Sequence, residues 1–404
     1  MLLTVSKRVE FSASRRLYVP DWTESENLIA FGPESAATYG SGRNYVVYFI
    51  FSGTVDPVTG MLINISEIKR RAGRIVDDEY DHKFLNQDNE AFRKLPPTAE
   101  NIARNLLQQV QPLFAKGDAQ LVAVHLREAP GRAATAYADG TCDTHYWFEF
   151  SAARRTMSPQ LSADENARVF GAAAGIHGHN YRARLTFRHE NFSGDGTAVR
   201  FDDLDHCIHS LRSELDHRYL NEDVAALRDR PLTTESLAEY IYERTNARIP
   251  LHRVRLHERD DFFAEVFEDE SMFVGMRVPF NAAHRLHVRS FSSEQNTELF
   301  GKCNNPAGHG HHYVTEATIG GVYDKRTGTL ADFVKLQQAM TKTLNEWNDH
   351  HLDFETTEFR ETPSTGENIV RTLWGKLDRE LDHRLARLRV WETRNNRFTL
   401  RRTV

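Results

Sequence analysis

The segment from residue 300 to 312 holds the residue types best suited to chemistry in this chain. It contains His309-Gly310-His311, and in a strand the first and third residues point to the same face, about 6.6 Å apart. Two imidazoles at that spacing can converge on one metal ion. His284, on a predicted strand just upstream, would complete a three-histidine set that leaves a fourth zinc position open for substrate, as in catalytic sites.

A His-X-His pattern by itself is more often a half-exposed pair of strand histidines than a metal site. Cys303 favours the metal interpretation. It lies in the turn-rich sequence Gly-Lys-Cys-Asn-Asn-Pro, which is poorly suited to burying a structural thiol. Zinc or a neighbouring imidazole would favour its thiolate. The histidines and the cysteine together therefore predict a catalytic centre.

The elements that must position these residues occur three times, with a period of about 130 residues, far longer than a solenoid repeat. Each copy opens with a short strand-like segment (residues 11–17, 150–155 and 280–286), followed by a Phe-Gly pair and a second strand. A helical segment then leads to an Asp-His pair. A second helix opens near a threonine, and two strands close the copy. The first closing strand carries a glutamate, which is Glu128, Glu258 or Glu392.

This order of elements, β-β-α-α-β-β, predicts an α+β domain in which an antiparallel sheet carries two helices on one face. We assign the domains to residues 1–140, 141–270 and 271–404. The segments 129–146 and 260–271 must each hold a closing strand as well as a linker. Because such linkers are short, we expect the copies to pack against one another.

The composition predicts a soluble globular protein. Of 404 residues, 40% are hydrophobic and 27% charged, and no run approaches the roughly 18 apolar residues of a membrane helix. The start lacks a secretory signal, so we expect a cytoplasmic protein with no membrane partner. The net charge of -6 and the scattered Lys and Arg argue against a nucleic-acid partner, although a few local arginines could hold a small anion. Three widely spaced cysteines argue against a disulfide framework.

The third copy resembles the 6-pyruvoyl tetrahydropterin synthases, the tunnelling-fold enzymes of tetrahydrobiopterin synthesis. Residues 300–311, FGKCNNPAGHGH, follow that family's signature. The likeness continues through residues 281–286, the pair Asp349-His350, and residues 365–368 and 390–393. Copies one and two match in layout but not in ligands. The resemblance implies three tandem tunnelling-fold domains whose antiparallel sheets form a pseudo-trimeric barrel with the helices outside.

The resemblance also implies a reaction, the zinc-dependent conversion of 7,8-dihydroneopterin triphosphate to 6-pyruvoyltetrahydropterin with loss of triphosphate. Zinc on His284, His309 and His311 would polarise the substrate side chain. Cys303 as thiolate would remove a proton, and an Asp-His pair would act as relay and proton donor. No cofactor beyond Zn2+ is implied.

The pterin ring would be anchored by Glu392 with help from Thr365 and Glu367. A carboxylate suits this role because it can accept two parallel N–H bonds from the amino-pyrimidine edge. The substrate is thus expected to be a small-molecule pterin.

Copies one and two depart from the metal pattern. In copy one the three ligand positions are Arg15, Ser41 and Arg43, so this copy cannot hold zinc in the same way. Copy two keeps His177 and His179, but Arg154 stands at the third position, and a cation beside two imidazoles disfavours a metal. Both copies lack the cysteine. We interpret the arginines as packing or salt-bridge residues that replace the metal's charge; the alternative is that these pockets bind an anionic pterin without turnover.

The sequence contains three Asp-His pairs, Asp81-His82, Asp216-His217 and Asp349-His350. One interpretation is that they stabilise a helix end or a loop. In the resembled family, however, domains form trimers and the active site takes zinc and cysteine from one subunit and Asp-His from its neighbour. We therefore hypothesise that Cys303 works with the pair of copy one or copy two, while the pair of copy three faces an interface without zinc.

Two other functions remain open. The first is 6-carboxytetrahydropterin synthase of the queuosine pathway, although there the cysteine normally stands closer to His-X-His than Cys303 does. The second is a pterin-binding pseudoenzyme, suggested by the two degenerate copies and by His312, where the family usually has Asn. The sequence predicts an intrachain pseudo-trimer and leaves open a homodimer of two chains that would form a pseudo-hexamer.

Overall fold

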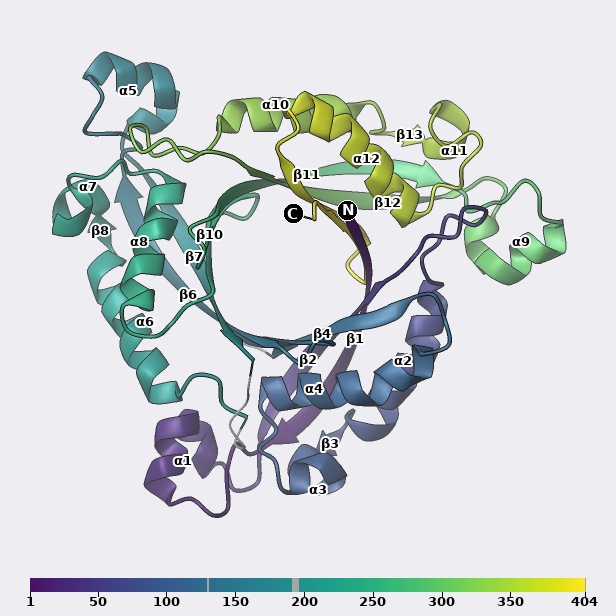
Figure 1. The fold of residues 1–404 in the computed structure, drawn as a ribbon, viewed down its shortest axis with the longest axis horizontal. Coiled ribbons are helices and arrows are strands. Elements are labelled where there is room, and N and C mark those ends of the chain that lie inside the picture. The colour runs from purple at the N-terminus through teal and green to yellow at the C-terminus, as the bar shows by residue number, and fades with distance from the viewer. Residues whose placement is uncertain (129–130, 191–195, 404) are drawn as a thin grey trace.

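The computed structural model describes residues 1–128, 131–190 and 196–403. Within these residues, twelve long strands form one closed antiparallel barrel with the main helices around its outside (Figure 1). Each copy contributes four of these strands. The predicted α+β class and the pseudo-trimeric barrel are confirmed.

The barrel strands have the following bounds. In copy one they are β1 (Leu2–Arg15), β2 (Ser41–Ser52), β4 (Gln120–Glu128) and β5 (Arg132–Tyr137). In copy two they are β6 (Cys142–Arg154), β7 (His177–His189), β9 (Arg253–Arg259) and β10 (Phe262–Phe267). In copy three they are β11 (Met272–His284), β12 (His309–Gly320), β14 (Leu385–Thr393) and β15 (Asn396–Arg401).

Two long helices per copy pack on the outside of the barrel. They are α2 (Ile65–Glu79), α4 (Ala99–Val110), α6 (Phe201–Leu215), α8 (Thr234–Asn246), α10 (Phe333–Asn345) and α12 (Gly366–Glu380). After the first of each pair comes a two-residue strand and one helical turn: β3 (Lys83–Phe84) with α3 (Leu85–Asp88), β8 (Arg218–Tyr219) with α7 (Leu220–Asp223), and β13 (His350–His351) with α11 (Leu352–Glu355).

A short helix that the sequence pattern did not predict joins the first two strands of every copy. These helices are α1 (Glu24–Phe31), α5 (Ala163–Phe170) and α9 (Ser293–Phe300), and each leads through a Gly into a 3-10 turn. All three begin with a capping box, in which a Thr or Ser side chain and the residue three positions later satisfy each other's backbone N–H groups. With eight residues and a low fraction of buried positions, they carry too weak a periodic pattern to be recognised by spacing.

The first strand of each copy is longer than predicted, because it has two partners. β1 pairs from Thr4 to Arg15 with β2 of its own copy. Its first part, Leu2–Lys7, also pairs with β15 of copy three. In the same way β5 pairs with β6, and β10 pairs with β11. These three cross-copy pairings close the barrel.

Strand residues alternate between an apolar outer face beneath the helices and a more polar face toward the barrel lumen. On β2, for example, Val47, Phe49 and Phe51 are fully buried under the helical layer, and the residues between them are partly exposed. The period of two thus gives the sheet a hydrophobic core on its outside.

The same hydrogen bond joins the copies at each of the three interfaces. Thr365, at the start of α12, donates from its hydroxyl to the carbonyl oxygen of Gly60 in copy one, at 2.7 Å. Thr98 donates in the same way to Gly196, and Thr233 to Gly328.

Glycine is required at these acceptor positions for two reasons. Gly60 has φ +71°, and an added Cβ would lie 2.4 Å from the side-chain nitrogen of Asn368. The equivalent glycines also have positive φ and face similarly close side chains.

Within the described residues, none of the helices combines the length and apolar character that crossing a lipid bilayer requires.

Candidate metal and pterin site

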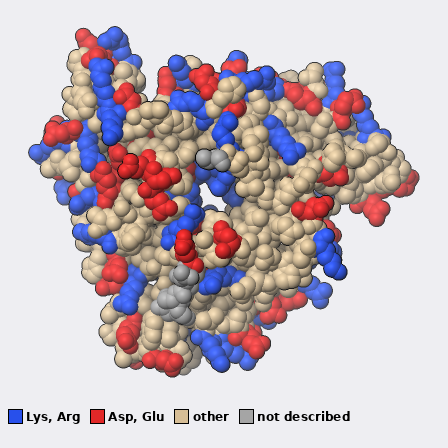
Figure 2. Space-filling model, in the orientation of Figure 1, with Lys and Arg blue, Asp and Glu red and all other residues tan. Residues whose placement is uncertain are grey.

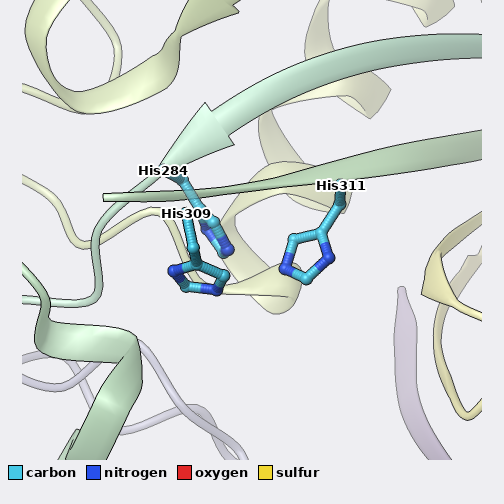
Figure 3. Close-up of side chains that lie close together, drawn as sticks. All are labelled: His284, His309 and His311. Carbon is cyan, nitrogen blue, oxygen red and sulfur yellow. The ribbon is translucent and has the colours of Figure 1, made fainter. Parts of the chain in front are cut away.

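Three histidine side chains converge where β11 ends and β12 begins. His284 lies directly opposite His309 in the register of these strands, and His311 follows two residues later on the same face. The ring centroids are 4.5 Å apart for His284 and His309 and 4.9 Å for His309 and His311, and one nitrogen of each ring lies within 4.8 Å of the others. Figure 3 shows the three rings on one side of the two strands. The predicted facial arrangement is therefore present.

The most buried of the three rings is oriented by the backbone. The Nδ1–H of His284 donates to the carbonyl oxygen of Ser364 at 2.9 Å, which leaves Nε2 for another partner. Burial lowers the pKa of His284 to about 4, so the imidazole is neutral, the form that binds a metal. Within the described residues, Nε2 of His284, Nε2 of His311 and Nδ1 of His309 are buried and without hydrogen-bond partners. Such a set of free nitrogens suits a metal ion.

Glu392 lies beside the histidines. Its Oε1 is 3.8 Å from Nε2 of His284 and 4.0 Å from Nε2 of His311. Its Oε2 accepts a hydrogen bond from the side chain of Asn396, which in turn accepts one from Lys7 of copy one. The carboxylate therefore lies beside two of the three histidines and is linked through Asn396 to copy one. Asn396 and Lys7 were not identified from the sequence, where no motif marks them.

Cys303 lies in the 3-10 turn after α9 and is partly buried. The loop that precedes α9 is held by the fully buried Asn296 of that helix. Its side-chain nitrogen donates to the carbonyls of Val288, Phe291 and Ser292. Burial and the carboxylate of Glu392 raise the pKa of the Cys303 thiol. Without a bound cation the thiol form is thus favoured, contrary to what the neighbouring imidazoles alone suggested.

Thr365 and Glu367 lie at the interface between copies three and one. Oε1 of the buried Glu367 accepts a hydrogen bond from the backbone N–H of Leu62, at 2.8 Å, and Thr365 contacts Gly60 as described above. The segment from Gly60 to Leu62 was missed by sequence reasoning. The signal that could have found it is a glycine two residues before an apolar residue, a pattern that recurs at Gly328 and Leu330. There the backbone N–H of Leu330 donates to Glu235, as that of Leu62 does to Glu367.

The Asp-His pairs of copies one and two have the same geometry. Asp81 accepts a hydrogen bond from the backbone N–H of Ser12 and contacts Nδ1 of His82 at 2.8 Å. Asp216 likewise accepts from Ser151 and contacts His217 at 3.0 Å. Each histidine has a positive φ and is fixed through its own N–H to the carbonyl of the same serine.

The prediction that Asp349-His350 is the third copy of this pair is wrong. The residue of copy three that stands where Asp81 stands in copy one is Asn348, which accepts a hydrogen bond from the N–H of Asn281. The next residue, Asp349, has a positive φ and so takes the place of His82. The strand pairing agrees, because His350 pairs with Ala282 where Lys83 pairs with Ala13, so the Asp-His dipeptide of copy three is shifted by one residue. The match in sequence letters concealed this shift, because His351 makes the local pattern ambiguous.

Strand register fixes each pair beside the first strand of its own copy. β3, which follows Asp81-His82, pairs with β1 at Ala13 and Ser14, and β8, which follows Asp216-His217, pairs with β6. β15 pairs with β1 only as far as Lys7, so β3 lies along the part of β1 that β15 leaves free. In Figure 1, β3 lies at the lower side of the molecule, away from the end of β11, where His284 stands.

The sites of copies one and two are filled by ion pairs. In copy two the buried Arg154 binds Glu258, which also contacts Nε2 of His179 at 3.0 Å. In copy one the buried Arg15 binds Glu128. Arg15 and Arg43 also pair with Glu34, which stands at the position of the cysteine, three residues after the Phe that ends the short helix. The arginines thus form salt bridges, although His177, His179 and Glu258 still bring their ligand atoms within 4.8 Å of one another.

Comparison with known proteins identifies this architecture. The family model described as 6-pyruvoyl tetrahydropterin synthase matches three times, at residues 4–139, 144–269 and 274–403. The chain is 38% identical to human 6-pyruvoyl tetrahydrobiopterin synthase over 125 residues, which cover 30% of this chain and 86% of the human one.

Two further matches are informative. A 6-carboxy-5,6,7,8-tetrahydropterin synthase of Rickettsia conorii is 26% identical over 145 residues, 32% of this chain and 96% of that protein. The solved structure of Caenorhabditis elegans 6-pyruvoyl tetrahydropterin synthase has 34% identity, covers 32% of this chain and 95% of its own, and gives a TM-score of 0.32.

The buried Glu367 predicts a pH-dependent stability. Burial raises its pKa to about 7 from an ordinary 4.5, so between these values the folded protein holds a proton that the unfolded chain releases. Stability should therefore fall as pH rises through this window. Glu367→Gln cannot ionise, and we expect it to exceed the wild type in unfolding free energy by on the order of 2–3 kcal/mol at pH 8, with little difference at pH 4. Denaturant unfolding at both pH values measures this difference. The control is Glu298→Gln, at an exposed position, which should follow the wild type. If the unfolding free energies of the wild type and of Glu367→Gln change with pH in parallel, the prediction is contradicted.

Proposed function

This chain belongs to the 6-pyruvoyl tetrahydropterin synthase family, whose domain it carries three times, and we propose that copy three is a zinc-dependent lyase acting on 7,8-dihydroneopterin triphosphate. The products are 6-pyruvoyltetrahydropterin and triphosphate. The observation that supports this most directly is that one copy alone combines the three converging histidines with a nearby cysteine and glutamate.

The metal proposed for this site is Zn2+, held by His284, His309 and His311. Three imidazoles with buried, unpartnered nitrogens fit zinc, and a three-ligand set leaves room for substrate oxygen. Bound zinc would supply Lewis-acid polarisation of the substrate hydroxyls. Glu392, within 4.0 Å of two of the ring nitrogens, is placed to accept a hydrogen bond from a hydroxyl at this position.

The ring of the pterin belongs, in this proposal, between copies three and one. Glu367 faces the copy-one segment at Leu62 and is the carboxylate best placed to accept N–H groups from the amino-pyrimidine edge. Thr365 holds Gly60 in place and so keeps the pocket wall closed. Because the buried Glu367 has its pKa near 7, ring binding that requires the carboxylate would favour pH above this value.

Proton transfer is assigned, in this proposal, to Cys303 and to one of the two intact Asp-His pairs, Asp81-His82 or Asp216-His217. Hydrogen bonds from a serine N–H and from the adjacent histidine lower the pKa of Asp81 and of Asp216, so each carboxylate stays ionised and orients its imidazole. The side chains of His82 and His217 are largely exposed, so a substrate and water can reach them. A degenerate copy would thereby supply part of the active site of the intact one.

Product analysis distinguishes the proposed reaction from its two rivals. We expect the zinc-loaded protein to release triphosphate from 7,8-dihydroneopterin triphosphate and to form a 6-pyruvoyl pterin, detected by mass spectrometry. Acetaldehyde with a 6-carboxy product would instead assign the chain to the queuosine reaction. Zinc binding without turnover would indicate a pterin-binding pseudoenzyme.

The arginine that replaces a ligand in copy two gives a test of the metal assignment. We expect one zinc per chain in the wild type and two in Arg154→His, because the variant would place three imidazoles around Glu258. The matched control is Arg15→His, which should still bind one, since Ser41 and Arg43 remain. Metal analysis after dialysis measures the stoichiometry. A count of one for Arg154→His, or two for Arg15→His, would contradict the assignment.

Alanine substitutions test which copy donates the Asp-His pair. Alanine at both Asp81 and Asp216 should lower kcat by about 100-fold or more, the usual contribution of a positioned acid–base group, because both intact pairs lose their carboxylate. The two single variants then show which copy donates the pair. Asp349→Ala is the control: it removes a carboxylate that is out of register with the two pairs and should leave kcat nearly unchanged. Loss of turnover in Asp349→Ala, with the double variant active, would contradict the assignment.

A further inference from the structure

The lumen of the barrel is lined with arginines. They occupy alternate strand positions whose neighbours, such as Leu388 and Val390, are buried beneath the helices, so their own side chains face inward. Figure 2 shows that the centre of the molecule is open, with basic side chains at the edge of the opening. The inward arginines include a group of eight: Arg184 on β7, Arg253 and Arg255 on β9, Arg277 on β11, Arg387 and Arg389 on β14, and Arg397 and Arg401 on β15.

Two carboxylates are shared among five of these arginines. Glu265 lies 2.8 Å from Arg387, 3.5 Å from Arg255 and 3.8 Å from Arg253. Glu316 lies 2.7–2.9 Å from Arg255, Arg277 and Arg389. Each carboxylate carries one negative charge, so the positive charge is in excess.

The other three arginines have no carboxylate within ion-pair distance among the described residues. Arg184 lies opposite Arg255 in the β7–β9 register and contacts the ring of Trp147. Arg397 donates to the hydroxyl of Ser6 at 3.1 Å. Burial, with the nearby Arg387, lowers the pKa of Arg401 to about 10.

Several guanidinium groups also have unused donors. Within the described residues, Nε of Arg184, Arg253, Arg387, Arg389 and Arg397 is buried and without a hydrogen-bond partner. Burial and the neighbouring Arg253 and Arg255 hold the pKa of Arg184 well below its ordinary value. Buried donors and like charges in this arrangement are costly unless an anion binds to them.

Strands β4 to β6 of the barrel also experience this positive field. His125 and His145 are linked through the hydroxyl of Thr135, at 2.8 and 2.9 Å. Burial holds the pKa of both rings well below the ordinary value, and the next cause is the charge of Arg397 for His125 and of Arg184 for His145. Both imidazoles are therefore neutral and add no positive charge of their own.

We propose that the barrel lumen binds an inorganic oligophosphate. Guanidinium groups recognise phosphoryl oxygens through paired charge-assisted hydrogen bonds. The cations are spread along the strands, since Arg397 and Arg401 are four residues, or about 13 Å, apart, which fits an extended multivalent anion better than a single phosphate. The chain as a whole has a net charge of -6, so the attraction is a property of the lumen and not of the protein surface in general.

This site is distinct from the histidine site, although the triphosphate released in the proposed reaction belongs to the class of anion it would bind. Titration of the full-length, zinc-loaded protein with tripolyphosphate in a calorimeter tests it at constant ionic strength. We expect saturable binding that Arg184→Met weakens by about tenfold or more, the value of a lost charge-assisted hydrogen bond. Arg74→Met, on the exposed face of α2, should bind as the wild type does.

A second readout separates lost binding from lost folding. Because Arg184 faces other cations without a counter-charge, Arg184→Met should raise the unfolding temperature in phosphate-free buffer while reducing the further rise that tripolyphosphate gives to the wild type. Arg397→Met, on β15 of the lumen wall, should show the same two changes in unfolding temperature. It replaces Arg184→Met in the experiment if that variant does not fold.

Three outcomes decide the proposal. Equal effects of sulfate and tripolyphosphate at the same ionic strength would reduce the finding to general screening and overturn it. Unchanged tripolyphosphate affinity in both arginine variants would also overturn it. ATP that binds as tightly as tripolyphosphate, with the same dependence on Arg184, would support it and show that the phosphate chain of a nucleotide suffices. Absence of lyase turnover would refute the proposed reaction but leave these binding results intact.

Discussion

Strand pairing between the copies is the constraint on which the rest of the structure depends. Each copy has four barrel strands, and its first strand is long enough to pair with its own second strand and with the last strand of the preceding copy. Because the three cross-copy pairings close the sheet, the twelve barrel strands of the described chain leave no exposed edge, and the contacts of Thr365 and Glu367 lie at an interface between copies. Loss of one copy would therefore remove a wall from the neighbouring site as well as four strands.

The three interfaces show how one scaffold can accept different charge arrangements. Copy three presents three imidazoles beside Glu392, whereas copies one and two place an arginine at the position of His284 and bind it to the equivalent glutamate. The arginines put a positive charge against the late carboxylate, which would otherwise be a buried anion without a partner, and a metal on the three imidazoles of copy three would do the same. The threonine-to-glycine contact is the same at all three interfaces, so the change in chemistry leaves the assembly intact.

Much of the fold followed from the sequence because its repeats could be compared with one another. Strand and helix order and the late glutamates recur at matching positions, and two of the three histidines recur in copy two. The Asp-His pair shows the limit of such comparison: Asp349-His350 matches the letters of Asp81-His82, but hydrogen bonds to Asn281 place it one residue out of register. The short helices between the first two strands were missed because eight residues give too little periodicity.

The sequence by itself determined the number of copies, the α+β class and which copy keeps three histidines and a cysteine, since these depend on residue type and local spacing. Tertiary structure alone decided what lies between the copies. Strand pairing between the copies brings Lys7 of copy one to Asn396 and Leu62 of copy one to Glu367. It also gathers scattered arginines into one lumen, because alternate residues of separate strands face inward only when the sheet closes. Such long-range neighbours leave no pattern along the chain.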